Sequence, residues 1–346
     1  MKFRENKNKD IIVWLGVVCL LVLSTVIVGG ITRLTHSGLS MVDWKPIMGV
    51  IPPITDQQWA LSFAKYKNFP EYISVFPSMS LAEYKSIFFW EYLHRMIGRL
   101  IGIVFFFPWL YFSLKRRYNL WTGTKLFFGF ILGGMQGVLG WYMVKSGLVN
   151  IPEVSHYRLA AHLVLALIIL GYLLWQLLDF LNLAHTEKTQ TNNGSWKASF
   201  FISMVILLQI VYGAFMSGLH GGFVHNTFPS MSGSFMPSDI WMLTPGWHNL
   251  VENVTSVQFI HRSLAWFLVL LVILHFGTAR KKVQNRWQQN SLKFLIAVLS
   301  FQFFIGVATL LLVVPVPLAS LHQFGGALLF MAAIFSAYTF KNTSAA

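Results

Sequence analysis

Four histidines and one glutamate stand inside otherwise apolar stretches of this 346-residue chain: Glu91, His94, His162, His261 and His322. Ionisable side chains within long apolar segments are expensive to bury, so each is a functional candidate. Imidazole nitrogen ligates iron well, and facing helices of a bundle can supply one ligand from each side. These residue types in this setting indicate a haem or metal site.

The four histidines are predicted to share one depth. Each lies roughly five to seven residues from the same end of an even-numbered apolar segment, at about 1.5 Å per residue. Two pairs fit two haems, His94 with His162 and His261 with His322. A single intramembrane histidine is more often a hydrogen-bonding partner, but four at matching places favour ligation. Zinc is disfavoured because it usually takes three or four close protein ligands.

Small residues accompany the histidines. One follows each histidine by four positions and shares its helical face, so that a flat macrocycle could approach the backbone. These residues are Gly98, Ala166, Ala265 and Gly326. Three glutamines, each four residues before a glycine, are interpreted as polar helix-packing contacts. They are Gln136, Gln209 and Gln302.

Glu91 is the candidate for acid or base chemistry, since it precedes His94 by three residues and shares its face. Its counterpart in the second half is Gln258, which cannot act as an acid or base. Chemistry is therefore expected in the first half, and cofactor binding alone in the second. The alternative is a glutamate favoured at a helix N-terminus by the dipole. Arg95 and Arg262 follow their histidines, either to bind haem propionates or to reach lipid headgroups.

The elements that position these residues are eight apolar segments. Hydropathy places them at 11–31, 88–113, 122–144, 157–181, 198–219, 256–278, 292–313 and 317–340. Hydrophobic residues make up 55% of the chain and charged residues only 11%, where a soluble domain has about 25%. The solvent is therefore expected to be the lipid bilayer, which needs about 20 apolar residues per helix.

Charge distribution predicts the topology. The net charge of +14 sits between apolar segments and is interpreted as a topology signal, not as a nucleic-acid surface. Basic residues near 115–125, 188–197 and 280–286 place those loops and both termini in the cytoplasm. The loops at 32–87 and 220–255 would lie outside. The N-terminus does not resemble a transit peptide, which favours a bacterial cytoplasmic membrane.

The two halves look duplicated. His94 and His261, Gln136 and Gln302, and His162 and His322 are separated by 167, 166 and 160 positions. A near-constant offset over three segments predicts a parallel internal repeat. The expected fold is an all-α membrane protein of eight transmembrane helices arranged as two tandem four-helix bundles. Residues 1–185 would form the first half and 186–346 the second.

The motifs resemble the haem A synthase family. The segment 91–99 reads Glu-Tyr-Leu-His-Arg-Met-Ile-Gly-Arg. His162, His261-Arg262 and Leu321-His322-Gln323 also match, as do Gly29-Gly30, the run from Thr32 to Thr35 and the run from Ser37 to Ser40. The resemblance covers nearly the whole chain. Some relatives carry a cysteine pair in the outer loops. This chain has only Cys19, and so resembles the branch shared by proteobacteria and mitochondria.

The resemblance implies an activity and a division of roles. The family oxidises the C8 methyl of haem O to a formyl group, giving haem A for terminal oxidases. His94 and His162 would hold the substrate haem, while His261 and His322 would ligate a resident haem b. Glu91 would match the acidic residue near the substrate. Haem O synthase and an unidentified electron-transfer protein are the implied partners, and no nucleic acid is expected.

Two other classes of function compete with this interpretation. A di-haem b-type cytochrome would only transfer electrons, would hold two chemically unchanged haems and would have no need of Glu91. A haem-binding or transporting protein would hold one exchangeable haem and would need no reductant. Duplicated bundles do occur in transporters, but no segment is unusually short or broken.

Overall fold

Eight long helices dominate the computed structural model, which describes residues 8–42, 48–147, 153–181 and 193–341. They are α1 (Lys9–Leu34), α4 (Leu81–Leu114), α5 (Leu120–Gly147), α6 (His156–Leu181), α7 (Asn193–Gly218), α8 (Val254–Ala279), α9 (Arg286–Leu311) and α10 (Val316–Thr339). All eight are long and apolar enough to cross a membrane. The prediction of eight spans in an all-α membrane protein is confirmed.

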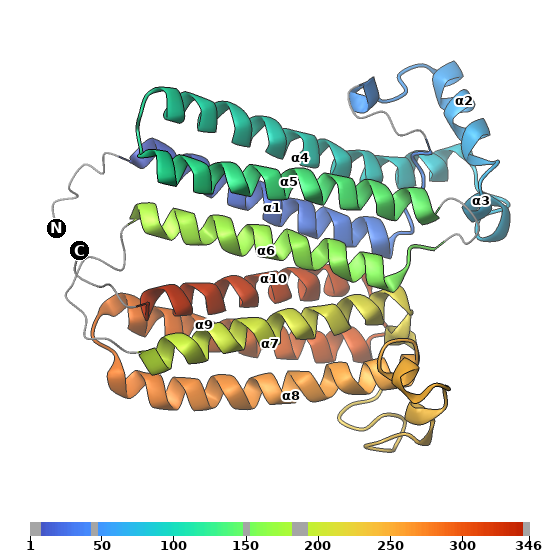
Figure 1. Ribbon diagram of the computed structural model, residues 1–346. Helices are drawn as coiled ribbons and strands as arrows, with labels where there is room; N and C mark the ends of the chain where they lie inside the picture. Colours follow the sequence, from blue (N-terminus) through green and yellow to red (C-terminus); the bar gives the residue numbers. More distant parts are fainter. Residues whose placement is uncertain (1–7, 43–47, 148–152, 182–192, 342–346) are drawn as a thin grey trace.

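Helix α4 starts earlier than predicted, at Leu81 instead of 88. A capping box sets its start: the Ser80 side chain accepts from the Glu83 backbone N–H, and the Glu83 side chain accepts from that of Ser80. The first two turns are more polar than the rest, so hydropathy does not detect them. His94 therefore lies thirteen residues from the start of its helix, not five to seven, and the start of α4 lies near α3 at one end of the bundle (Figure 1).

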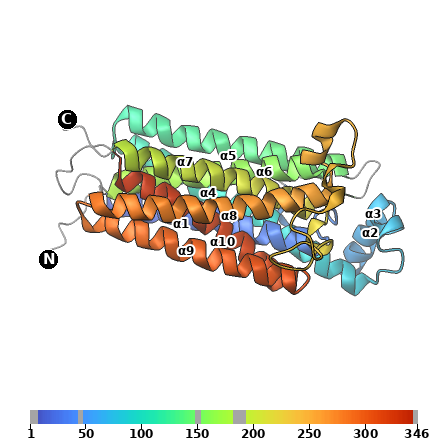
Figure 2. The ribbon, with the colours of Figure 1, turned by 90° about the horizontal axis from the view of Figure 1, so that it is seen from below.

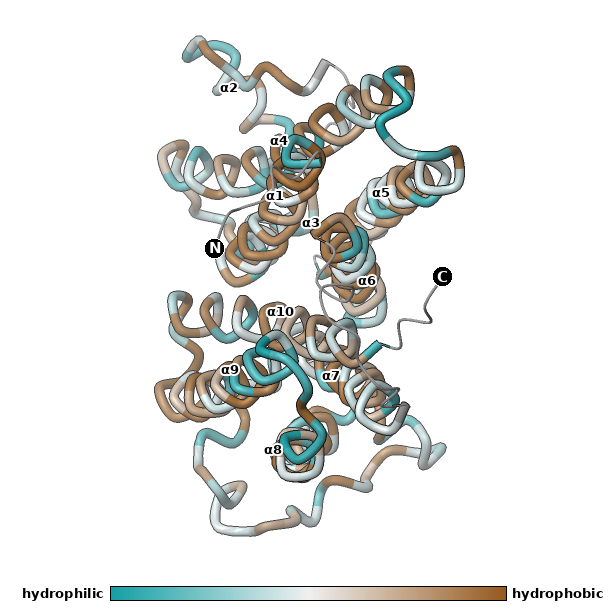
Figure 3. The backbone as a smooth tube through the Cα atoms, turned by 90° about the vertical axis from the view of Figure 1, so that its left-hand side faces the viewer, coloured by the Kyte–Doolittle hydropathy of each residue, from teal (hydrophilic) through white to brown (hydrophobic). Residues whose placement is uncertain are grey.

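The helices form two groups of four, seen end-on in Figure 3. In the first group α1 packs on α4 and α6, and α5 also packs on α4 and α6. In the second, α7 packs on α8 and α10, and α9 packs on the same two helices. The neighbour pattern is the same in both groups, and it is consistent with tandem four-helix bundles. The groups meet through α1, α6, α7 and α10.

Burial follows this arrangement. The largest apolar core runs along α1, α6, α7 and α10, where side chains such as Leu15, Leu170, Ile206 and Ala333 are almost fully buried. Helices α4, α5 and α8 instead carry many exposed large apolar side chains, among them Phe107, Phe128 and Leu270. Apolar surface of this extent suits a lipid environment.

Short helices cap one end of the bundle (Figure 2). Helices α2 (Asp56–Tyr66) and α3 (Pro70–Ser74) lie beyond the start of α4, and α2 packs on it. The 3₁₀ turns η2 (Gly221–Phe223), η3 (Ser238–Trp241) and η4 (Gly246–Leu250) pack on α8. We call α2, α3 and the chain between them the first cap. Its aromatic core joins Phe63 and Tyr66 to Tyr84 and Phe88 of α4.

Candidate haem-ligand site and acidic centre

The four predicted ligands fall on equivalent helices, one on each even-numbered helix of the bundle. His94 lies on α4 and His162 on α6, while His261 lies on α8 and His322 on α10. Each of the four residues is partly exposed.

The second pair of histidines lies close together. The rings of His261 and His322 are arranged edge to face, with centroids 6.5 Å apart and planes at 76°. That spacing admits one metal atom between two nitrogens at about 2 Å each. The Nδ1 atom of His322 is buried and has no hydrogen-bond partner. These two side chains therefore fit a haem iron.

The first pair is arranged on corresponding helices. Within the described residues, no three His, Cys, Asp or Glu side chains converge as a multi-ligand metal site would need.

Each histidine is backed by a glycine on the preceding odd-numbered helix. A methyl group at Gly29 would lie 3.0 Å from His94, and one at Gly140 would lie 2.9 Å from His162. The corresponding distances are 3.3 Å from Gly213 to His261 and 2.7 Å from Gly306 to His322. The absence of a side chain at these glycines makes room for the imidazole rings.

Three glutamines also contact these histidines. Nε2 of Gln136, Gln209 and Gln302 donates to the backbone carbonyls of His162, His261 and His322 respectively, each at 3.0 Å. The sequence interpretation of these glutamines as general packing contacts missed their role beside the histidines. The repeated spacing of glutamine and glycine on three odd-numbered segments was the signal that could have revealed it.

Substituting Gly306 with alanine tests this backing. The added methyl would come within 2.7 Å of His322 Cε1, so the ring must shift. Groups that orient a metal ligand typically change affinity about 10- to 100-fold, and we expect haem binding to weaken in that range. Gly277→Ala on α8, where no atom lies within 4 Å, is the matched control. Optical titration with haem measures both; equal affinities would contradict the backing role.

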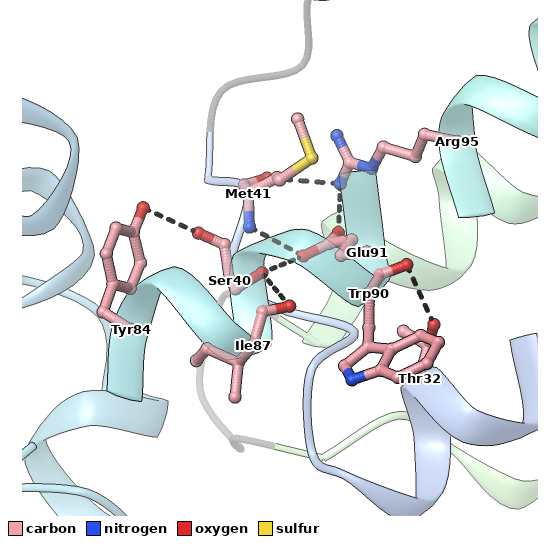
Figure 4. A network of polar contacts seen from close by, with 8 residues as sticks. All are labelled: Thr32, Ser40, Met41, Tyr84, Ile87, Trp90, Glu91 and Arg95. Atoms are coloured by element: carbon pink, nitrogen blue, oxygen red, sulfur yellow. Dashed lines mark hydrogen bonds and ion pairs between the residues drawn. The ribbon is translucent and has the colours of Figure 1, made fainter. Parts of the chain in front are cut away.

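Glu91 is buried at 2% exposure and is held by three donors (Figure 4). Ser40 Oγ and the Met41 backbone N–H each donate to Oε2 at 2.7 Å, and Arg95 Nη2 donates to Oε1 at 2.5 Å. Arg95 also donates to the Met41 carbonyl at 3.2 Å. A carboxylate offers about four acceptor positions. The network therefore fixes Glu91 as an oriented carboxylate with room for roughly one more donor.

The residues of the second half that correspond to Glu91 and Arg95 make different contacts. Gln258 Nε2 donates to the His225 carbonyl at 3.1 Å, and its buried Oε1 has no partner. Arg262 donates to the carbonyls of His225, Thr227 and Ser230. Arg95 and Arg262 thus both anchor the chain that covers their bundles, a use that neither sequence alternative anticipated.

The small residues of α4 and α5 also differ from their counterparts in the second half. On α4 and α5 a methyl group at Gly98, Gly102, Gly133, Gly134 or Gly137 would meet no atom within 4 Å. At the positions equivalent by the repeat offsets, the second half has larger residues: Ala265, Val269, Leu299, Ser300 and Phe303. Phe303 packs on Trp266 with ring centroids 4.8 Å apart. The second half therefore carries bulkier side chains where the first half has glycine.

The Gly29-Gly30 pair joins the halves as well as admitting a histidine. Gln323, next to His322 on α10, crosses to α1 and donates to the Val26 carbonyl at 2.7 Å. A side chain at Gly30 would overlap Gln323 Oε1, at 2.1 Å. One glycine therefore makes room for His94 and the next for the contact between the bundles.

Comparison with known proteins agrees with this architecture. Residues 12–334 match the family described as cytochrome oxidase assembly protein. A relative from Nitrosospira multiformis, named heme A synthase, is 44% identical over 95% of this chain and 92% of its own length. Relatives with the same name from Parvibaculum lavamentivorans and Flavobacterium psychrophilum are 45% and 42% identical, over 93% and 92% of this chain and 92% and 94% of theirs. This chain therefore belongs to the cytochrome oxidase assembly protein family.

Proposed function

We propose that this protein is a haem A synthase, an oxidoreductase that converts the C8 methyl of haem O to the formyl group of haem A for terminal oxidase. The observation that carries the proposal is the unequal pair of bundles. Both bundles have histidines backed by glycine, but only the first has a buried carboxylate three residues before a ligand. An electron carrier with two equivalent haems would have no use for that difference.

The site residues follow from the same difference. His94 and His162, in the half formed by residues 1–185, hold the substrate haem O and release haem A. His261 and His322, in the half formed by residues 186–346, are the axial ligands of a resident haem b. When bound there, haem b supplies one-electron transfer. The protein orients the iron ligands through the glycines and glutamines that back them.

Glu91 acts on protons at the substrate. Oxidising a methyl group to a formyl group removes hydrogen from carbon, and a positioned carboxylate can accept those protons. Ser40, Met41 and Arg95 hold the Glu91 oxygens in place, and burial keeps bulk water away from them. We assign Glu91 as the catalytic residue.

We also propose the location and partners. The protein spans the bacterial cytoplasmic membrane, with both termini in the cytoplasm as the basic loops predict. The histidine layer, the first cap and the 3₁₀ turns that pack on α8 then face outward. Haem O synthase would deliver the hydrophobic substrate through the bilayer, and a separate electron-transfer partner would exchange electrons with the enzyme.

Haem extraction tests the function directly. The protein is purified from cells that also express a haem O synthase, and its haems are separated by chromatography and identified by mass. Haem b together with haem O or haem A is the expected result. Two haem b per chain, unchanged by the supply of haem O, would instead identify a di-haem cytochrome.

The glycines of α4 and α5 support assignment of the exchangeable haem to the first half, because the second half carries bulkier side chains at the equivalent positions. We expect Gly137→Phe, which copies Phe303 of the second half, to lower haem A formation about 10-fold or more by filling space that the substrate needs. Resident haem b should remain. Gly137→Ala is the graded control, since its methyl meets no atom. Haem A per haem b, measured after extraction, is the readout; an unchanged ratio in the Phe variant would contradict the assignment.

A further inference from the structure

A short segment of the chain is fastened to both α8 and α9 on the outside of the second bundle. We call this segment, residues 225–230, the strap; it belongs to the chain that wraps around α8 (Figure 3). Asn226 Nδ2 donates to the Leu310 carbonyl in the last turn of α9, at 2.9 Å. From α8, Arg262 donates to the Thr227 carbonyl at 2.8 Å. The strap therefore crosses the boundary between these two helices.

Phe228, in the middle of the strap, completes a cluster of three aromatic rings. Its ring stacks on Trp266 of α8 with centroids 6.1 Å apart, and it meets Phe303 of α9 edge to face at the same distance. Trp266 and Phe303 lie 4.8 Å apart. Trp266 is 50% exposed, so the cluster lies at the surface of the bundle and not in its core. These three rings, which we call the aromatic triad, join α8, α9 and the strap.

The boundary that the triad crosses is the weakest one in the second bundle. Helix α7 packs closely on both α8 and α10, and α9 packs closely on α10, whereas α8 and α9 contact each other least. The helices that carry His261 and His322 are flanked by α7 and α9. A group held by these two histidines could therefore leave sideways most easily between α8 and α9, where the strap and the triad lie.

The first bundle has different residues at the corresponding boundary. Helices α4 and α5 are the neighbours that contact each other least in that bundle. By the repeat offsets, Arg99 stands where the second half has Trp266, and Gly137 stands where it has Phe303. Glycine has no ring and arginine is charged, so these two positions cannot form an aromatic cluster. The same weak boundary is therefore closed by aromatic side chains only at the positions of the second half.

We propose that the strap and the aromatic triad determine which bundle keeps its haem, by closing the way from the second bundle into the bilayer between α8 and α9. The inference rests on the proposed function, because it takes haem b as the resident cofactor of His261 and His322. Phe228 and Trp266 act as a barrier and supply no ligand, so they are positioning residues. The barrier opens when Phe228 leaves its two ring contacts and the strap detaches from α9.

A barrier has a kinetic signature that a simple binding contact lacks. Lowering a barrier speeds entry and loss alike, so the affinity changes less than either rate. Phe228→Ala removes both ring contacts of the strap, and the loss of two aromatic pairs should raise both rates about 10-fold. Asn226→Ala frees the strap from α9 but keeps all three rings. It should raise both rates about 5-fold, as for the loss of one hydrogen bond.

The experiment measures both rates in the full-length protein with His94→Met as the parent, so that only the second bundle keeps haem in our proposal. Loss is followed as transfer of haem b to an excess of apomyoglobin. Uptake is followed by absorbance when haemin is added to protein made in haem-starved cells. Phe235→Ala is the matched control and should behave as the parent, because this ring lies in the same chain outside the strap and is 77% exposed.

Faster loss together with faster uptake in Phe228→Ala and Asn226→Ala is the expected result. Parent rates in Phe228→Ala would overturn the proposal. Faster loss with unchanged uptake would also overturn it, since the ring would then be only a wall of the haem pocket. If Phe228→Ala fails to fold, Asn226→Ala decides by the same criteria. A parent that holds no haem b would refute the proposed resident site, whereas a parent that holds haem b beside variants with parent rates would refute the barrier alone.

Discussion

Replacing Glu91 with glutamine is expected to stop haem A formation, with a loss of about 10²- to 10⁴-fold as for a positioned acid or base. Glutamine is nearly isosteric but cannot take up a proton. It also removes the 2.5 Å ion pair with Arg95. The fold should survive, because the second half already carries Gln258 at the equivalent position, buried at 1% exposure. Haem O should accumulate in the protein beside haem b.

The measurement is the haem composition of purified Glu91→Gln protein, with Gln258→Glu as the mirror-image control. The control should still form haem A, because it changes the half without chemistry. Normal haem A from the Glu91→Gln protein would remove this residue from the mechanism. Loss of both haems would mean that the carboxylate serves structure alone.

The second large effect is expected from exchanging a ligand in each bundle. His261→Met should change the axial pair of haem b from two imidazoles to imidazole and thioether. Such a change raises the reduction potential, here on the order of 100 mV. The mixed pair should also bind haem more weakly. Because the resident haem relays electrons in our proposal, haem A formation should fall at least about 10-fold with it.

His94→Met is the matched variant in the first bundle. It should leave the spectrum and potential of haem b unchanged while farnesylated haem is lost from the extract. Redox titration followed by haem extraction separates the two results. Equal loss of haem b from both variants would refute the division into a substrate half and a resident half.

The sequence by itself determined the membrane class, the eight spans and the ligand candidates. Spans of at least 20 apolar residues have no stable alternative to helix in lipid, where every backbone group must be bonded within its own segment. Polar residues inside such spans are conspicuous, and this made His94, His162, His261, His322 and Glu91 identifiable. Comparing repeat positions also exposed the difference between Glu91 and Gln258.

Hydropathy could not predict some local features of the structure. The early start of α4 depends on the capping box between Ser80 and Glu83, which lies in a polar stretch and contributes no apolar signal. The roles of Arg95 and Arg262 stayed open because an arginine beside a histidine can serve several acceptors. Only the path of the covering chain showed which backbone carbonyls they meet.

Contacts between distant parts of the chain were decided by the tertiary structure. Gly29 makes room for His94, Gly30 for Gln323, and Gly306 for His322. These pairings depend on which helices pack together and in what register. Such pairings span 16 to 293 positions, and no spacing rule predicts them. The first cap brings residues from three segments into one buried cluster, where desolvation gives them properties that none would have in isolation.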